Sequence, residues 1–328
     1  MIGWYVHHHG QGHLQRLRSI TAALGEPVTV LSSLPAPADF TGGWVVLADD
    51  LPAGCDVDVT ARGTLHWAPR HHPGLRERMA TIAAWVAEHR PALVVVDVSV
   101  EVALLVRSMG VPVVVAAMRG DRSDRPHRSA YDLADALLAP WPAELPEPWP
   151  EPWLDKTWHV GALSRHDDRP REERPGRSRV LVLWGRGGTD VTMADVDAAA
   201  AATPGWAWNS CGLVGEPWVD DPWPLLQAAD VVVTHAGQNT LAEVAAARRP
   251  AVVVPQARPH GEQLANARAL TAGGLAVVEA TWPAPATWAA LLDEASDLDP
   301  AGWERWSDGG GAARAAALLD GAAACARR

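Results

Sequence analysis

One run of residues, Thr234–Glu243 (T-H-A-G-Q-N-T-L-A-E), combines types and spacing that could bind an anion. It lies between two valine-rich runs, which predicts a strand, a sharp turn at Gly237 and a helix that begins at Asn239 or Thr240. Free amide N–H groups and the positive end of the helix dipole would meet at one spot, which suits phosphate. Thr240 and Glu243 could instead form a capping box that only satisfies backbone donors. The local sequence leaves both interpretations open.

A second run, His7–His13 (H-H-H-G-Q-G-H), lies between a strand predicted at Ile2–Val6 and a helix predicted at Leu14–Leu24. Consecutive side chains at a strand end point to opposite sides, so we do not expect the three adjacent histidines to converge on one metal ion. His13 has two interpretations. It could remove a proton from a hydroxyl group, because imidazole exchanges protons near neutral pH, or it could simply cap the following helix.

Asp97 follows a fully apolar predicted strand, Leu93–Val96, and a helix is expected from Ser99. The strand Val113–Ala116 then completes a β-α-β unit. The carboxyl ends of such strands are where the active sites of α/β proteins gather. Asp97 could hold a catalytic group there, or it could cap the helix. The same patterns predict further strands at 28–31, 45–47, 136–139, 180–184 and 206–209, and a helix at 71–89.

Composition limits the class of protein. A chain of 328 residues suggests about two domains, and 48% hydrophobic residues suffice for two buried cores. The formal net charge of −11 argues against a nucleic-acid partner, because phosphate backbones require a basic surface. The cysteines, Cys55, Cys211 and Cys325, are too few and too far apart for a disulfide framework, which suggests the reducing cytoplasm. No run approaches the ~20 apolar residues that cross a bilayer, so we expect no transmembrane segment.

The run Asp230–Asn266 resembles the nucleotide-sugar signature of GT-B glycosyltransferases. The matching features are H-A-G-Q-N-T, Glu243, the V-V-V-P run and the pair Glu262-Gln263. It is most similar to the peptidoglycan N-acetylglucosaminyltransferase and natural-product UDP-glycosyltransferase families, and G-Q-G-H resembles their G-x-G-H loop. The triple histidine is a departure, and the glycine-rich G-G-x-G-G-H start of the peptidoglycan enzyme is absent. A small-molecule acceptor or another envelope glycan is therefore at least as well supported as a lipid-linked peptidoglycan precursor.

The resemblance implies an α/β protein of the GT-B fold, with two facing Rossmann-like domains, parallel sheets and an interdomain cleft. We expect an N-terminal acceptor domain at residues 1–163, a linker at 164–178 and a C-terminal nucleotide-sugar domain at 179–328. The last helix could cross back to the N-terminal domain. A short strand is expected at 159–163, where such enzymes enter their second half. Proline and tryptophan crowd residues 140–152, which predicts an extended surface segment.

The resemblance also implies roles for individual residues. His13 would be the general base and Asp97 would hold it, while Glu243 would bind the ribose and Glu262 with Gln263 the donor sugar. The remaining donor-site candidates surround the diphosphate; they are Gly187, Gly188, His235, Ala236, Gly237, Gln238, Asn239 and Thr240. The loop 211–218 would seat the nucleobase. Gly12 and Arg119 are the acceptor-side candidates, although a charged run such as 118–129 is by default a solvated loop.

The expected activity is an inverting, metal-independent transfer of a sugar from a nucleoside diphosphate, a UDP-sugar, to an acceptor hydroxyl. No metal and no cofactor are expected. The metal-binding motif D-x-D occurs at Asp56–Asp58 but recurs at Asp195–Asp197 and Asp297–Asp299, so it carries little information. Two alternatives remain open: a UDP-sugar 2-epimerase on the same fold, and a non-catalytic nucleotide-sugar-binding module. Contact with a membrane surface is also left open, and the acceptor is unidentified.

Overall fold

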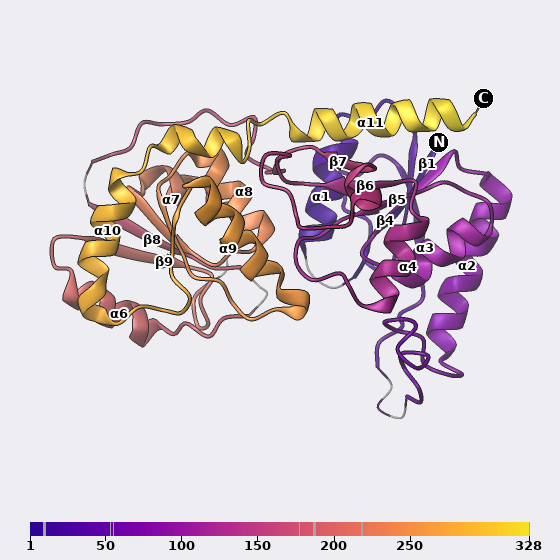
Figure 1. The fold of residues 1–328 in the computed structure, drawn as a ribbon, viewed down its shortest axis with the longest axis horizontal. Helices are drawn as coiled ribbons and strands as arrows, with labels where there is room; N and C mark the ends of the chain where they lie inside the picture. The colour runs from indigo at the N-terminus through magenta and orange to yellow at the C-terminus, as the bar shows by residue number, and fades with distance from the viewer. Residues whose placement is uncertain are drawn as a thin grey trace.

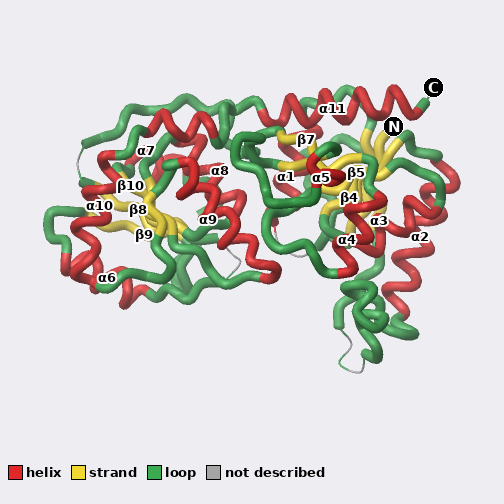
Figure 2. Tube along the Cα trace, in the orientation of Figure 1, coloured by secondary structure: helices red, strands yellow, loops and turns green. Residues whose placement is uncertain are grey.

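The computed structural model describes residues 1–8, 11–52, 54, 56–176, 178–185, 188–217 and 219–327. His9, Gly10, Cys55 and the donor-site candidate Gly187 lie outside the described residues. The chain forms two lobes side by side, each with a parallel sheet between layers of helices (Figures 1 and 2). This arrangement is the expected pair of Rossmann-like domains.

The N-terminal lobe contains a seven-stranded parallel sheet with the order β3-β2-β1-β4-β5-β6-β7. Its strands are β1 (Ile2–Tyr5), β2 (Val28–Ser32), β3 (Gly43–Val46), β4 (Leu93–Asp97), β5 (Val113–Ala116), β6 (Ala136–Ala139) and β7 (Thr157–His159). The helices between them are α1 (Gln11–Thr21), α2 (Pro73–His89), α3 (Val100–Ser108), α4 (Arg125–Leu133) and α5 (Glu151–Leu154). In register, Ile2 of β1 lies between Val28 of β2 and Leu93 of β4.

The C-terminal lobe contains a five-stranded parallel sheet with the order β12-β11-β10-β8-β9. Its strands are β8 (Arg179–Leu183), β9 (Ala207–Cys211), β10 (Val231–Thr234), β11 (Ala251–Val253) and β12 (Val277–Val278). Its helices are α6 (Met193–Ala202), α7 (Trp223–Ala228), α8 (Gln238–Ala247), α9 (Glu262–Gly273) and α10 (Trp288–Asp297). Three 3-10 turns complete the lobe: η1 (Pro259–Gly261), η2 (Pro285–Thr287) and η3 (Pro300–Arg305). The last helix of the chain, α11 (Gly311–Ala326), packs on the N-terminal lobe.

The valine-rich strands form because both faces of each sheet are covered. Successive residues of a strand point to opposite faces, so a strand buried on both sides is apolar throughout. Val180 and Val182 of β8 belong to one buried cluster, whereas Leu181 and Leu183 belong to the cluster on the other face. The central strands of each lobe therefore give the continuous apolar runs by which the sequence located them.

The segment rich in proline and tryptophan differs from its prediction, because it is not a surface segment. Trp141, Trp149 and Trp153 are all buried, and they pack edge to face against one another. Proline also does not prevent a helix here, since Pro152 lies in the first turn of α5, where a missing N–H costs no hydrogen bond. The short strand expected at 159–163 is likewise displaced. It is β7, which ends at His159 and belongs to the first sheet.

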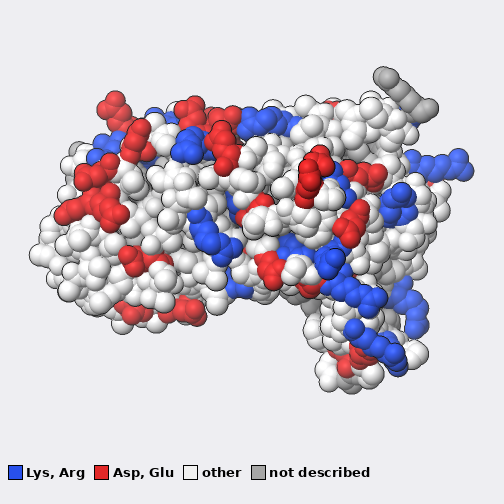
Figure 3. Space-filling view, in the orientation of Figure 1, with Lys and Arg blue, Asp and Glu red and all other residues white. Residues whose placement is uncertain are grey.

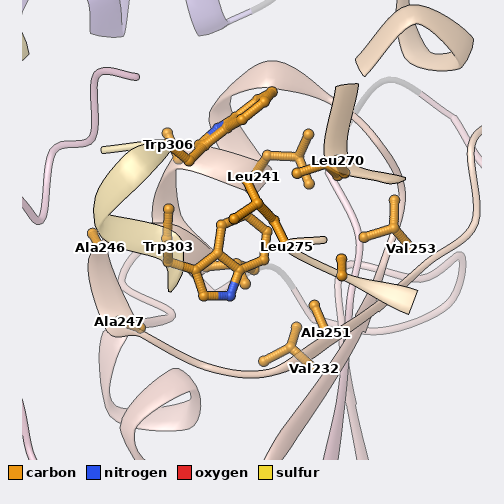
Figure 4. Packing of buried hydrophobic residues seen from close by; sticks show 14 of the residues in the cluster. Val232, Leu241, Ala246, Ala247, Ala251, Val253, Leu270, Leu275, Trp303 and Trp306 are labelled. Atoms are coloured by element: carbon orange, nitrogen blue, oxygen red, sulfur yellow. The ribbon is translucent and has the colours of Figure 1, made fainter. Parts of the chain in front are cut away.

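The C-terminal tail contacts both lobes in turn. Trp303 and Trp306, in and just after η3, pack against Leu241 and Leu270 in the core of the C-terminal lobe (Figure 4). The chain then crosses over, and α11 lies along the N-terminal lobe near the N-terminus (Figure 1). There it packs against α1 and β4, and Asp320 accepts hydrogen bonds from two backbone N–H groups that follow α1. The tail therefore connects the two lobes a second time.

Surface charge is mixed on the face shown in Figure 3. Acidic side chains gather over the C-terminal lobe on the left, while basic and acidic groups alternate over the middle and right. None of the helices in the described part of the chain has both the length and the apolar character needed to span a bilayer.

The packing of α11 gives a prediction with an internal control. Leu319 is fully buried against the N-terminal lobe, whereas its neighbour Leu318 is 38% exposed. We expect Leu319→Ala to lower the free energy of unfolding of the N-terminal lobe by about 2–5 kcal/mol, because it leaves a cavity. Leu318→Ala should cost much less, because that side chain is partly exposed. The two changes alter helix propensity equally, so the difference between them reports packing. Urea unfolding monitored by tryptophan fluorescence would compare them, and equal losses would contradict the packing.

Candidate functional site

Each sheet has one point at which its strand order reverses, and we consider the carboxyl ends of the strands there. In the first sheet the strand order reverses between β1 and β4, and in the second it reverses between β8 and β10. Loops at the carboxyl ends of strands on either side of such a reversal leave a crevice in which α/β proteins bind ligands. Here a single cavity of about 1100 Å³ joins the two crevices. Its polar lining includes Gly12, His13, Gln15, Arg16, Arg165, Gly185, His235, Gly237, Gln238, Asn239, Thr240, Glu243, Arg258, Glu262 and Gln263.

His13 and Asp97 meet in the N-terminal half of this cavity. The Nδ1 atom of His13 lies 3.0 Å from Oδ1 of Asp97, at the end of β4. The same oxygen accepts a hydrogen bond of 2.7 Å from the Arg16 guanidinium, and Asp97 is completely buried. Burial opposes ionisation of Asp97, but Arg16 and His13 outweigh it and lower its pKa to about 2. The carboxylate is therefore charged near neutral pH, and it favours the tautomer of His13 with the proton on Nδ1.

Asp97 does not cap the helix that follows it. Ser99 is the N-cap of α3, and its side chain accepts a hydrogen bond from the backbone N–H of Val102. Between them, Val98 has a φ of +61°, a left-handed conformation that is costly for a β-branched residue. The chain therefore bends sharply after β4 and leaves the Asp97 side chain directed at His13 and Arg16.

The predicted anion-binding turn joins β10 to α8. The helix begins at Gln238, and Gly237 at the N-cap offers no side-chain hydrogen bond. Within the described residues, the first-turn N–H groups of Gln238, Asn239 and Thr240 therefore have no capping side chain. Gly237 has an ordinary φ of −72°, so a left-handed turn is not what requires glycine here. A Cβ atom at that position would lie 2.2 Å from the His235 ring, which explains the glycine by close approach.

His235 supports this turn as a neutral side chain. Burial and nearby Arg258 lower its pKa to about 4. Its Nδ1 atom accepts a hydrogen bond of 2.8 Å from the N–H of Gly237, so the remaining proton belongs on Nε2, 3.3 Å from the Thr240 hydroxyl. The N–H of Gly185 also points at Nε2 from 3.2 Å, and a neutral ring can accept from only one of these two N–H groups at a time.

The capping-box interpretation of Thr240 and Glu243 does not hold. Thr240 contacts His235, and the carboxylate of Glu243 accepts a hydrogen bond of 2.9 Å from Nε of Arg165. Gln15, on α1 of the opposite lobe, lines the same cavity. Burial raises the pKa of Glu243 although Arg165 opposes the shift. Glu243 is thus a buried carboxylate in the cavity wall, bound by Arg165 from outside its own helix.

Two contacts join the lobes across the cavity. Nη2 of Arg16 donates a hydrogen bond of 3.1 Å to the Gln238 side chain, at the start of α8. Gly12 faces Asn239, whose amide nitrogen would lie 2.4 Å from a Cβ atom at position 12. The second glycine of G-Q-G-H therefore permits α8 to approach the N-terminal loop closely.

The pair Glu262 and Gln263 begins α9, and its members face different partners. Glu262 lines the cavity, and burial raises its pKa. Gln263 also lines the cavity, but its side-chain oxygen accepts a hydrogen bond of 2.8 Å from the N–H of Gln256. Asn266, one turn later, donates a hydrogen bond of 2.9 Å to the carbonyl of Ala236, which is fully buried behind the cavity wall. Ala236 and Asn266 thus fix the turn, while Glu262 presents its carboxylate to the cavity.

Part of the glycine-rich loop after β8 lines the cavity. Gly185 lines the cavity, and Gly188 has a left-handed φ of +85°. The carbonyl of Gly188 accepts a hydrogen bond of 2.8 Å from Arg258, which lines the same cavity. Arg258 places a positive charge beside the turn of α8.

Arg119, by contrast, does not line this cavity, nor the smaller one described below. It is buried, with Glu147 at 2.7 Å and the rings of Trp141 and Trp306 at 4.9 and 5.4 Å from its guanidinium carbon. It therefore holds the tryptophan-rich segment against the C-terminal tail. Arg122 of the same charged run does line a cavity.

This second cavity, of about 360 Å³, adjoins the first at His13, Met118 and Glu262. Its lining is mainly apolar and includes Val98, Val100, Val115, Ala130 and Tyr131. At its rim are His66, His127 and His260, which surround Asp124. Burial lowers the pKa of His127 to about 4.

Several of these residues escaped the sequence analysis. Arg16 and Gln15 lie in the helix that was expected after His13, but the sequence suggested a role only for His13 itself. Arg165 lies in the expected linker, and Arg258 precedes the matched Glu262-Gln263 pair. The only signal was position: each residue lies within five residues of a predicted site residue or in a predicted loop.

The lowered pKa of Asp97 gives a prediction for stability against pH. A carboxyl group whose folded pKa lies below its ordinary value stabilises the fold above that value, and this contribution is lost as the pH falls through the folded pKa. We expect the difference in unfolding free energy between the wild type and Asp97→Asn to shrink by roughly 2 kcal/mol as the pH falls from about 5 to about 2. Urea unfolding at several pH values measures it. A difference independent of pH would contradict an ionised Asp97.

Known glycosyltransferases are similar to this chain in sequence. Residues 215–282 match the glycosyltransferase family 28 C-terminal domain. The chain is 36% identical over 175 residues to the UDP-N-acetylglucosamine–N-acetylmuramyl-(pentapeptide) pyrophosphoryl-undecaprenol N-acetylglucosamine transferase of Sorangium cellulosum, covering 50% of this chain and 39% of that protein. It is 29% identical over 239 residues to the enzyme of the same name from Thermus thermophilus, covering 65% and 67%. The chain thus spans about two fifths of the first relative and two thirds of the second.

Solved structures share the whole architecture. The glycotransferase of kitacinnamycin superposes with a TM-score of 0.68 at 21% identity, covering 98% of both chains. UGT2 of Phytolacca americana, complexed with UDP-2fluoro-glucose and pterostilbene, gives a TM-score of 0.64 at 14% identity, covering 99% of this chain and 98% of that chain. At these identities the likeness establishes the fold alone. The resemblance indicated by the sequence is therefore confirmed: the chain has the GT-B fold, and part of its C-terminal lobe matches the glycosyltransferase family 28 C-terminal domain.

Proposed function

We propose that this chain transfers a sugar from a nucleoside diphosphate to an acceptor hydroxyl group, with inversion at the anomeric carbon. The observation that supports it best is the placement of two groups in one cavity. The open first turn of α8 suits an anionic diphosphate, and His13 with its buried carboxylate lies in the opposite lobe. A donor bound between them would have its leaving group on one side and a base on the other.

On the donor side, the N–H groups at the start of α8 would bind the diphosphate, with Arg258 adding positive charge. These groups would stabilise the negative charge that grows on the leaving diphosphate, so the proposal requires no metal ion there. Glu243 would accept two hydrogen bonds from the ribose. Arg165 must then share the Glu243 carboxylate with the ribose or release it. Glu262, and Gln263 with the hydrogen atoms of its amide, would hold hydroxyl groups of the sugar.

On the acceptor side, His13 would act through Nε2, because the N–H at Nδ1 donates a hydrogen bond to Asp97 and keeps its proton. Nε2 would remove the proton from the acceptor hydroxyl as its oxygen attacks the anomeric carbon. The bond from that carbon to the diphosphate oxygen would break, and its electron pair would leave with the diphosphate. Asp97 would stabilise the imidazolium ion that forms, which makes it a positioning residue.

The adjoining apolar cavity would receive the acceptor. Its lining favours a small molecule with an apolar body and a hydroxyl group near His13. For the donor, UDP is the first choice, because the Sorangium relative is named for a UDP-sugar and the Phytolacca structure contains one.

Calorimetric titration without added metal tests the donor site. We expect one of UDP, dTDP and GDP to bind in the micromolar range. Glu243→Ala should weaken that binding by about 1–3 kcal/mol, the usual cost of losing a charged hydrogen-bonding partner. The exposed Asp293, on α10, supplies a matched control as Asp293→Ala. Binding of no diphosphate, or equal affinity in both variants, would remove the basis of the assignment.

A separate prediction concerns His13. With donor and an acceptor found by screening, His13→Ala should lower kcat by about 100- to 10,000-fold, the usual contribution of a general base. Donor affinity should be unchanged, and the product should have the opposite anomeric configuration to the donor. Turnover of the donor without acceptor would instead favour an epimerase. Full activity of His13→Ala would contradict the base, and absence of turnover with every acceptor would favour a binding module.

A further inference from the structure

Three histidines and one aspartate converge at the rim of the smaller cavity, away from the turn at α8. His66 lies in the loop between β3 and α2, Asp124 is the N-cap of α4 and His127 is in its first turn. His260 comes from η1 in the C-terminal lobe. One ligand atom of each residue lies within 4.8 Å of the others. The two lobes thus assemble the cluster together.

The spacing of these atoms resembles a metal site. Zinc bonds of ~2.0–2.1 Å in a tetrahedron separate neighbouring ligand atoms by roughly 3.4 Å. Nε2 of His66 lies 3.3 Å from one carboxylate oxygen of Asp124, and Nδ1 of His260 lies 3.5 Å from the other. Nδ1 of His127 is closer to that second oxygen, at 2.6 Å, and would move outward by less than one ångström to reach the zinc spacing.

We propose that His66, Asp124, His127 and His260 bind one transition-metal ion of the zinc class. Imidazole nitrogen with a single carboxylate is a donor set that zinc accepts. Four protein ligands fill a tetrahedron, so the site is structural and leaves no position for a metal-bound water. One rearrangement is required: Nη1 of Arg122 lies 3.1 Å from Nε2 of His127, and that nitrogen must carry a proton once Nδ1 binds metal. Arg122 retains the carbonyls of Met118 and Arg119 as acceptors.

The site would join the two lobes at the acceptor cavity. His260 already has a left-handed φ of +60°, and its carbonyl accepts a hydrogen bond of 2.7 Å from the N–H of Asp121. The backbone of His260 is thus fixed against the N-terminal lobe, and its ring lies 3.5 Å from Asp124 before any metal binds. Because three ligands belong to one lobe and the fourth to the other, a bound ion would favour the arrangement in which the lobes are close. This proposal does not depend on sugar transfer.

Cobalt is the probe, because tetrahedral Co²⁺ gives strong visible absorption bands. Chelator-treated full-length protein should bind one Co²⁺ per chain with tetrahedral bands, and Zn²⁺ should displace it. Asp124→Asn, which keeps a side chain that can cap α4, and His260→Ala should each weaken binding at least roughly 100-fold, since even outer partners of ligands change affinity 10- to 100-fold. Thermal unfolding without metal would verify that both variants fold.

Two controls separate this site from other histidines. His89→Ala removes an exposed histidine at the end of α2 and should leave Co²⁺ binding unchanged. The double change His7→Ala with His8→Ala tests the histidine-rich loop after β1 and should retain the tetrahedral bands. Absence of those bands in the wild type would overturn the proposal. So would binding that survives His260→Ala and Asp124→Asn but is lost with the His7 and His8 changes.

Discussion

The buried charge of Asp97 is the constraint on which the rest of the site depends. A carboxylate removed from water is stable only where cations and hydrogen-bond donors surround it. Asp97 meets this condition through Arg16 and His13, which share its Oδ1 atom. Its other oxygen, Oδ2, has no hydrogen-bond partner within the described part of the chain. These two partners outweigh the cost of burying the charge, and removing either of them would leave that cost less fully offset.

Arg16 also couples this charge to the opposite lobe. One of its terminal nitrogens bonds to Asp97 and the other to Gln238, at the first residue of α8. A single guanidinium thus spans the reversal point of the first sheet and the helix at the reversal point of the second. Its planar, fixed geometry makes it better suited to this double contact than a lysine would be. The positions of His13 and of the turn that begins α8 are consequently not independent of each other.

The sequence predicted the fold and the turn between β10 and α8 because both depend on local patterns. Valine-rich strands, the order of strand and helix, and the H-A-G-Q-N-T turn are each legible within a few residues. The partner of Glu243 could not be found in this way. Arg165 reaches it from the linker, 78 positions earlier in the chain, and only the fold brings the two together. The cluster around Asp124 is a stronger case, since its histidines lie up to 194 positions apart, from His66 to His260.

The tryptophan-rich segment was mispredicted for a related reason. Proline correctly argued against a central strand, but the burial of Trp141 depends on a partner distant in sequence. Arg119 lies over the Trp141 ring and pairs with Glu147, so a charged loop and an apolar segment bury each other. The same guanidinium contacts Trp306, next to η3. A residue expected to face substrate thus anchors the tail where it crosses between lobes. A buried arginine with an ion pair and two aromatic faces is costly to displace, so this contact holds the tail firmly where it passes from one lobe to the other.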